Sequence, residues 1–257
     1  MKTRLAKFIS DSGGASRREA ERLIENGSVS VNGKPVTTPV FFVEPNDVVA
    51  INNEPVRTRT RTQIIAFNKP ANTMTTLRDP DGRKTIYDCL PKNMRGLKYV
   101  GRLDYKTTGL LLLTNDGDIA RRLTLPESKI VRVYTAKLRP DPGAAKSPNG
   151  VRRLREFLSP LSADDSVFDS LRRGATIDGV KYAPMEIELL SRYPLLVKIK
   201  LTEGKKNEIR IAFDYIGLPV SKLNRESYGP IELGNLESGK FRELTGKELT
   251  QLTAKSC

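Results

Sequence analysis

The sequence predicts an α+β fold in two parts, a small N-terminal module and a larger domain built on a mixed, mainly antiparallel sheet. Helical and strand patterns follow one another in the first part, whereas the second has many short strand patterns and few helical ones. That order disfavours a doubly wound parallel sheet, in which strands and helices alternate. A basic stretch without an apolar pattern separates the parts. We therefore expect domains at residues 1–57 and 64–257, joined by a linker at 58–63.

The N-terminal module begins with a helical pattern, because apolar side chains in residues 5–9 recur at i, i+3 and i+4. A second helix is expected after Ser16, since Glu19 lies three residues later in the capping-box arrangement. Residues 29–31 alternate Val with Ser and predict a strand. Asn32-Gly33 then favours a hairpin turn, because both residues tolerate positive φ.

Three arginines of the second helix, Arg17, Arg18 and Arg22, lie away from its apolar stripe. A solvated charged face explains them without a partner, whereas a polyanion would offset the repulsion between Arg18 and Arg22, one turn apart. The module resembles the small RNA-binding module first known from a small-subunit ribosomal protein, over residues 4–9, 15–24 and 27–34. That family places its basic second helix against structured RNA, so the resemblance implies RNA binding by these arginines.

In the second part, apolar or alternating runs predict strands at residues 64–67, 110–113, 131–135, 185–190 and 195–201. The first strand is expected to end at residues 68–70, which include a proline, and Asp118 is a candidate cap for a helix after the second strand. Residues 139–150 predict a loop. Further helices are expected over 151–158, with Val151, Leu154 and Leu158 as its apolar positions, around Ile209 and after Thr245.

Composition restricts the possible chemistry. Lys and Arg number 44 and Asp and Glu 30, so the formal net charge is +14, which favours a polyanionic partner. There is no histidine, which excludes His-based catalysis and His metal ligands. Cys89 and Cys257 match no disulfide or zinc spacing. Without a membrane-length apolar run or a signal-peptide core, the chain is expected to be cytoplasmic, with no metal and no membrane contact.

The loop at residues 101–109 is the best candidate for catalysis, because it places polar groups between two apolar strand patterns. In a chain without histidine, Asp104 is a plausible nucleophile or acid–base group. The spacing alone also fits a turn aspartate that hydrogen-bonds the next amides.

Residues 101–117 resemble the catalytic loop and following strand of RNA pseudouridine synthases, closest to the subgroup that has the N-terminal RNA-binding module and modifies ribosomal RNA. The resemblance implies that Asp104 is the catalytic residue and that Arg102 contacts RNA backbone near the flipped nucleotide. Residues 133–138 match the family strand whose tyrosine packs against the target base, here Tyr134. Residues 201–210 match the segment whose basic residue pairs with the aspartate, here Arg210.

Two positions depart from that family pattern, which more often has Asn and then Arg where this chain has Lys206 and Asn207. The departure puts RNA contacts by these two residues in doubt. Residues 139–185 fit the resemblance poorly and are longer than usual for the subgroup.

The resemblance implies an isomerase that breaks the uridine C–N glycosidic bond, rotates the base and rejoins it through carbon. No net oxidation or group donation occurs, so no cofactor is expected. The uridine must be flipped out of folded RNA to react. Residues 77–83 look like members that act on large-subunit ribosomal RNA. Alternative interpretations are a non-catalytic assembly protein on the same fold, or a synthase for small-subunit or transfer RNA. The enzyme is expected to be a monomer.

Overall fold

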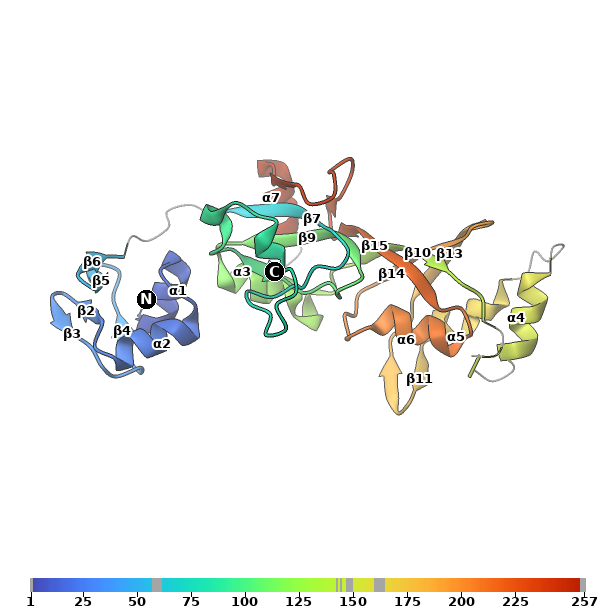
Figure 1. Ribbon diagram of the computed structural model, residues 1–257, viewed down its shortest axis with the longest axis horizontal. Coiled ribbons are helices and arrows are strands. Elements are labelled where there is room, and N and C mark those ends of the chain that lie inside the picture. Colours follow the sequence, from blue (N-terminus) through green and yellow to red (C-terminus); the bar gives the residue numbers. More distant parts are fainter. Residues whose placement is uncertain are drawn as a thin grey trace.

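The computed structural model describes residues 2–56, 62–141, 143, 145–146, 150–159 and 165–254. The N-terminal module (residues 2–56) lies at one end of an elongated molecule, and the large domain (residues 62–254) forms the rest (Figure 1). Most of the expected linker falls outside the described residues. Within those residues, no helix is both long and apolar enough to cross a membrane.

The N-terminal module packs two helices against short strands, as the sequence predicts. Its elements are β1 (Thr3–Arg4), α1 (Leu5–Ser12), α2 (Arg17–Glu25), β2 (Val29–Val31), β3 (Lys34–Pro35), β4 (Phe42–Val43), β5 (Val49–Ile51) and β6 (Glu54–Pro55). Within residues 2–56, β3, β2, β5 and β6 form one sheet in that order, and β1 pairs with β4. Leu5, Ile9 and Ile24 are fully buried in the module's own core, so the module has a packed interior separate from that of the large domain.

Local signals set the ends of these helices. The Ser16 side chain accepts a hydrogen bond from the Glu19 N–H at 3.2 Å, which caps α2 as expected. Gly13 follows α1 with φ +82°, where a residue with a Cβ would be strained. Asn32 and Gly33 both have positive φ in the β2–β3 turn, which confirms the predicted hairpin.

The large domain has a mixed sheet and peripheral helices. Its strands are β7 (Ile64–Lys69), β8 (Lys98–Val100), β9 (Thr108–Thr114), β10 (Arg132–Leu138), β11 (Ala175–Ile177), β12 (Val180–Tyr182), β13 (Glu186–Arg192), β14 (Leu195–Leu201), β15 (Val220–Tyr228), β16 (Ile231–Glu232) and β17 (Phe241–Glu243). Its helices are α3 (Gly117–Thr124), α4 (Gly150–Leu158), α5 (Asp169–Arg172), α6 (Glu208–Tyr215) and α7 (Gly246–Ala254). The α+β prediction is therefore confirmed.

In the described part of the chain, nine strands form the main sheet, with the path β13-β14-β10-β15-β9-β7-β17 and β16 and β8 beside β15 and β9. All pairs in it are antiparallel except β9 with β15. That parallel pair joins the two halves of the sheet at Gly109 and Arg225. A Cβ at Gly109 would lie 2.3 Å from the Arg225 carbonyl oxygen, so only glycine allows the approach.

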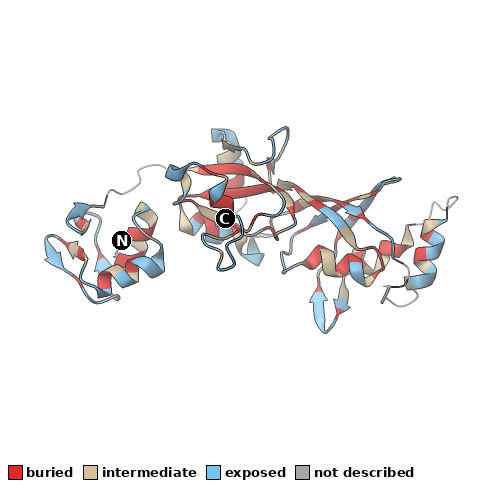
Figure 2. Cartoon of the chain, viewed as in Figure 1, coloured by how far each residue is buried: buried red, intermediate tan, exposed pale blue. Residues whose placement is uncertain are grey.

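Two clusters of buried side chains flank the sheet (Figure 2). The larger cluster packs β10 and β14 against α4, α5 and α6, and the smaller packs β7 and β9 against α3 and α7. Along β10, Tyr134, Ala136 and Leu138 are buried and Lys137 is exposed, so one face of this strand meets the core and the other meets solvent.

Three local expectations need correction. Strand β7 continues through Lys69 and ends only at Pro70, because residues 68 and 69 still pair with β9. Asp116, not Asp118, caps α3, since its carboxylate accepts from the N–H groups of residues 118 and 119. In α4 the buried face contains Phe157 with Leu154, whereas Val151 is exposed.

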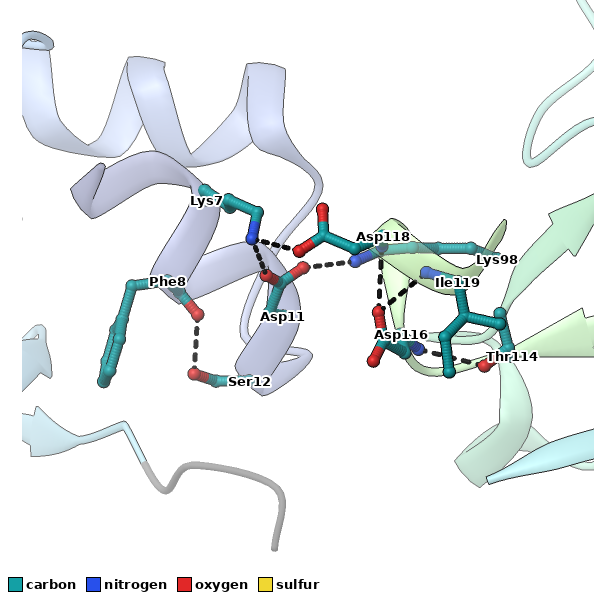
Figure 3. A network of polar contacts seen from close by, with 9 residues as sticks. All are labelled: Lys7, Phe8, Asp11, Ser12, Lys98, Thr114, Asp116, Asp118 and Ile119. Carbon is teal, nitrogen blue, oxygen red and sulfur yellow. Dashed lines mark hydrogen bonds and ion pairs between the residues drawn. The ribbon is translucent and has the colours of Figure 1, made fainter. Parts of the chain in front are cut away.

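Asp118 instead takes part in contacts between the module and the large domain. Lys7 of α1 donates to the Asp118 carboxylate at 2.6 Å, and Lys98 donates to Asp11 at 2.7 Å. Lys7 Nζ also lies 3.4 Å from Asp11 Oδ2, so positive and negative side chains alternate across the boundary (Figure 3). We call Lys7, Asp11, Lys98 and Asp118 the domain clasp.

Candidate functional site

The loop that carries Asp104 connects β8 to β9, which pair with each other and hold its two ends together. Leu103 is buried and anchors the loop in the larger core. The Thr75 hydroxyl donates to the Leu103 carbonyl at 2.8 Å and accepts from the Leu103 N–H at 3.4 Å. Asp104, the next residue, is half-buried. A carboxylate on a loop held this tightly has a restricted position, as a catalytic group requires.

Lys69, at the end of β7, lies beneath this loop and is fully buried. Its ammonium donates to the carbonyls of Pro70, Tyr105 and Thr107 at 3.0, 3.3 and 2.9 Å. Burial lowers the pKa of Lys69 to about 8, and the negative charge of Asp104 opposes that shift. Lys69 therefore ties the segment that follows Asp104 to the end of β7 and contributes positive charge near Asp104. Sequence reasoning missed Lys69, because its burial depends on loop carbonyls that lie more than thirty residues away in the chain.

Arg210 approaches the same region from the first turn of α6, where buried Ile209 anchors the helix. Its Nη1 donates to the Val220 carbonyl at 3.0 Å, and its buried Nη2 has no hydrogen-bond partner among the described residues. Burial lowers the pKa of Arg210, and Asp104 opposes the shift. The described residues contain no Arg210–Asp104 ion pair within 4 Å. The structure thus brings the two charges into electrostatic range without the direct pair that the resemblance implies.

Tyr134 lies in the middle of β10 with 8% of its surface exposed. Its cross-strand neighbours are Ile199 and Arg225. Arg225 is 2% exposed and donates through Nε to the Leu110 carbonyl at 2.6 Å, while its buried Nη2 has no partner among the described residues. Arg225 is a second buried cation that no local sequence pattern predicts, because its environment depends on the β9–β15 pair.

Arg102 has a different environment, since its side chain is exposed and forms no ion pair with any described residue. It lies two positions before Asp104, on the loop itself. The arginines of α2 are also exposed: Arg17, Arg18 and Arg22. Arg22 lies 3.7 Å from Glu19 on its own helix, and Arg17 is near enough to Asp118 to lower that residue's pKa, after the larger effect of the Lys7 hydrogen bond. The basic face of α2 therefore begins close to the domain boundary.

The turn before α6 contains residues 206 and 207, where the chain departs from the family pattern. Asn207 has φ +54°, a conformation that asparagine tolerates better than most residues, and its side chain makes no cap. Glu208 accepts a hydrogen bond from the Lys205 N–H at 3.0 Å. Burial and the neighbouring Glu203 raise the pKa of Glu208 to about 8. These contacts hold the start of α6, and with it Arg210.

Across the part of the chain that the structure describes, no group of three or more Cys, Asp or Glu side chains is arranged to hold a metal ion. The groups gathered around Asp104 are instead two cations, Lys69 and Arg210, and the carbonyls of a well-anchored loop. This arrangement places two positive charges within electrostatic range of the Asp104 carboxylate.

Comparison with known proteins assigns both parts of the chain. Residues 63–215 match the family described as RNA pseudouridylate synthase, and residues 3–49 match the S4 domain. The chain belongs to the RNA pseudouridylate synthase family. Members of this family isomerise uridine to pseudouridine in RNA, and the S4 match identifies the N-terminal module as an RNA-binding domain.

Relatives of the synthase extend over nearly the whole chain. An RNA pseudouridine synthase of Rickettsia bellii is 37% identical over 95% of this chain and 97% of its own length. A Bacillus subtilis protein named ribosomal large subunit pseudouridine synthase B is 34% identical, covering 98% of this chain and 96% of that protein. A crystal structure of a pseudouridylate synthase is 26% identical, with a TM-score of 0.65 and 97% of this chain covered. The expected fold and enzyme class are confirmed.

Proposed function

We propose that this synthase acts on large-subunit ribosomal RNA, with Asp104 as its catalytic residue. The supporting observation is the end-to-end similarity to the Bacillus subtilis large-subunit enzyme, at 34% identity. A Vibrio cholerae protein with the same name is also 34% identical over 98% of this chain, which is 74% of that protein's length.

The reaction balances without an added reagent. The bond between C1′ of the ribose and N1 of uracil breaks, a bond between C1′ and C5 forms, C5 loses a proton and N1 gains one. No electrons enter or leave, so the proposed enzyme needs no cofactor and no metal. Asp104 either attacks the sugar or removes a proton from it, and both routes require an ionised carboxylate close to the ribose.

The surrounding residues have roles that follow from their positions. Lys69 and Arg210 supply positive charge near Asp104. The Nη2 of Arg210, which has no partner among the described residues, is available to donate to Asp104 in the complex with RNA. The nearly buried Tyr134 would pack against the target base, which must leave its helix or loop to reach this position.

Exposed cations would then bind the RNA around the flipped nucleotide. Arg102 lies on the catalytic loop, and Arg17, Arg18 and Arg22 lie on the S4 domain. Contacts of these side chains with phosphate release counterions and make binding sensitive to salt. We further propose that the enzyme is a monomer and that it acts on ribosomal RNA in the cytoplasm.

Pseudouridine mapping in cells with and without the gene for this protein tests the substrate. The account predicts that one or more pseudouridines disappear from large-subunit ribosomal RNA and return when the wild-type protein is supplied. Loss of a pseudouridine from small-subunit or transfer RNA alone would contradict the proposed substrate. An unchanged map in all three classes would favour the non-catalytic alternative.

A further inference from the structure

We propose that the large domain has a second RNA-binding site, a pocket at the end that carries α4, which holds a single-stranded nucleotide flanking the target uridine. The proposal rests on RNA being the substrate. The pocket has a volume of about 510 Å³, within the range of roughly 300–1,000 Å³ that is usual for small-molecule sites. It lies between α4, the β13–β14 hairpin and the adjacent ends of β10 and β15 (right-hand end in Figure 1).

The pocket combines an apolar floor with an exposed aromatic ring. Phe157 and Leu158 of α4 belong to the floor. Tyr193, in the turn between β13 and β14, is 80% exposed, more than any other large apolar or aromatic residue among the described exposed ones. An exposed ring beside an apolar recess is the arrangement on which unpaired bases stack, because every base has a π-face.

Among the described residues that line the pocket, the charged ones are the cations Lys137, Arg139, Arg192 and Lys222. Lys137, Arg139 and Lys222 form no ion pair with a described residue. Lys137 and Lys222 are direct cross-strand partners in the β10–β15 pair, and both are exposed. Like charges placed opposite each other destabilise a sheet, and a phosphate between them would remove that cost. The positive charges at the rim therefore favour binding of a polyanion over binding of a protein segment that has no acidic residues.

Chain geometry connects this pocket to the catalytic site. Leu138, which lines the pocket, follows Tyr134 by four residues on the same face of β10, roughly 13 Å along the strand. Arg210 donates to the carbonyl of Val220, and the next two residues of β15, Ser221 and Lys222, line the pocket. A nucleotide bound there would lie on the same RNA strand as a uridine at Asp104.

Substitution at Tyr193 tests the stacking contact, with a large-subunit rRNA transcript that the wild-type enzyme modifies as the probe. Tyr193→Ala should raise the half-saturating RNA concentration roughly 5- to 100-fold, since stacking contributes that much per base. Tyr193→Phe keeps the ring and should bind like wild type. In a transcript carrying 4-thiouridine, ultraviolet light should attach RNA to the peptide that contains Tyr193.

The rim is tested separately through salt dependence. In the double variant Lys137→Ala and Lys222→Ala, the slope of log affinity against log salt concentration should be smaller in magnitude by roughly one to two. Lys247→Ala, an exposed lysine of α7 that does not line the pocket, serves as the control and should leave the slope unchanged.

Two failures are distinguishable. If the wild-type enzyme forms no pseudouridine in the transcript, the proposed substrate is wrong. If it forms pseudouridine but Tyr193→Ala binds like wild type and no RNA attaches at Tyr193, the second site is overturned, and the pocket would then be left to a protein segment.

Discussion

Lys69 is the residue whose environment is most unusual. It is a fully buried lysine whose only described partners are three backbone carbonyls, and burial lowers its pKa from 10.5 to about 8. Because this cation supports the loop of Asp104, its protonation affects both stability and the site.

Lys69→Met tests that environment by removing the charge while keeping the chain length. Between pH 8 and 10.5 the unfolded wild-type chain holds a proton that the folded chain has lost, so its free energy of unfolding rises with pH. Relative to Lys69→Met, wild type should gain on the order of 1–3 kcal/mol over this window and nothing between pH 6 and 7.5. Urea unfolding at matched pH values measures the difference; a difference that stays flat up to pH 10.5 would mean that Lys69 has an ordinary pKa.

Arg210 has a role that its conservative variants can separate from simple RNA binding. Arg210→Lys keeps a charge but loses the planar fork, and Arg210→Ala removes both. Losing a charged hydrogen bond of about 1.5–3 kcal/mol corresponds to a roughly 10- to 150-fold slower reaction, with Ala the more severe. Single-turnover rates at saturating RNA measure this. An Ala variant with the wild-type rate and only weaker binding would assign Arg210 to phosphate contact.

At the scale of secondary-structure elements, the junction of β9 and β15 holds the two halves of the sheet together beside the catalytic loop. Gly109→Ala would place a methyl group 2.3 Å from the Arg225 carbonyl oxygen at φ +100°. We expect a loss of about 3 kcal/mol or more in stability. Gly234→Ala is the matched control, because Gly234 also has positive φ but no atom within 4 Å. Thermal unfolding of both variants compares them, and equal losses would show that the close contact is unimportant.

Sequence reasoning reached the elements whose signals are local. The Ser16 cap, the Asn32-Gly33 turn and the apolar strand at residues 110–113 all depend on neighbours within a few positions, and the structure confirms each. The family resemblance also placed Asp104 and Arg210 in one region.

What escaped prediction depends on contacts between distant parts of the chain. The parallel pairing of β9 with β15 joins segments more than a hundred residues apart, and it makes Gly109 essential and buries Arg225. The local sequence marks Lys69 only as the end of a strand, because its role depends on the loop carbonyls of Tyr105 and Thr107. Asp118 was a plausible cap by sequence, yet it faces Lys7 across a domain boundary that no local pattern marks.

At the scale of the whole molecule, the domain clasp fixes how the S4 domain faces the catalytic domain. Its members are partly exposed, with Lys7 at 31% and Asp118 at 62% side-chain exposure. Exposed ion pairs each contribute only about 0.2–1 kcal/mol, so the docking is expected to be weak and sensitive to salt.

Small-angle scattering of the free enzyme tests the clasp. Lys7→Ala combined with Lys98→Ala should increase the radius of gyration at low salt, and about 1 M salt should have the same effect on wild type. Arg22→Ala removes an ion pair inside the S4 domain, so it should change neither the radius of gyration at low salt nor its response to salt. A radius that is independent of both salt and the clasp variants would show that other contacts hold the domains together.

The central claim is that Asp104 carries out uridine isomerisation in large-subunit ribosomal RNA. The most direct measurement is single-turnover formation of pseudouridine in a large-subunit rRNA transcript by wild type and by Asp104→Asn, which keeps size and hydrogen bonding but removes the charge. We predict no detectable product from Asp104→Asn, with unfolding and RNA affinity close to those of wild type. Substantial turnover by this variant would contradict the account.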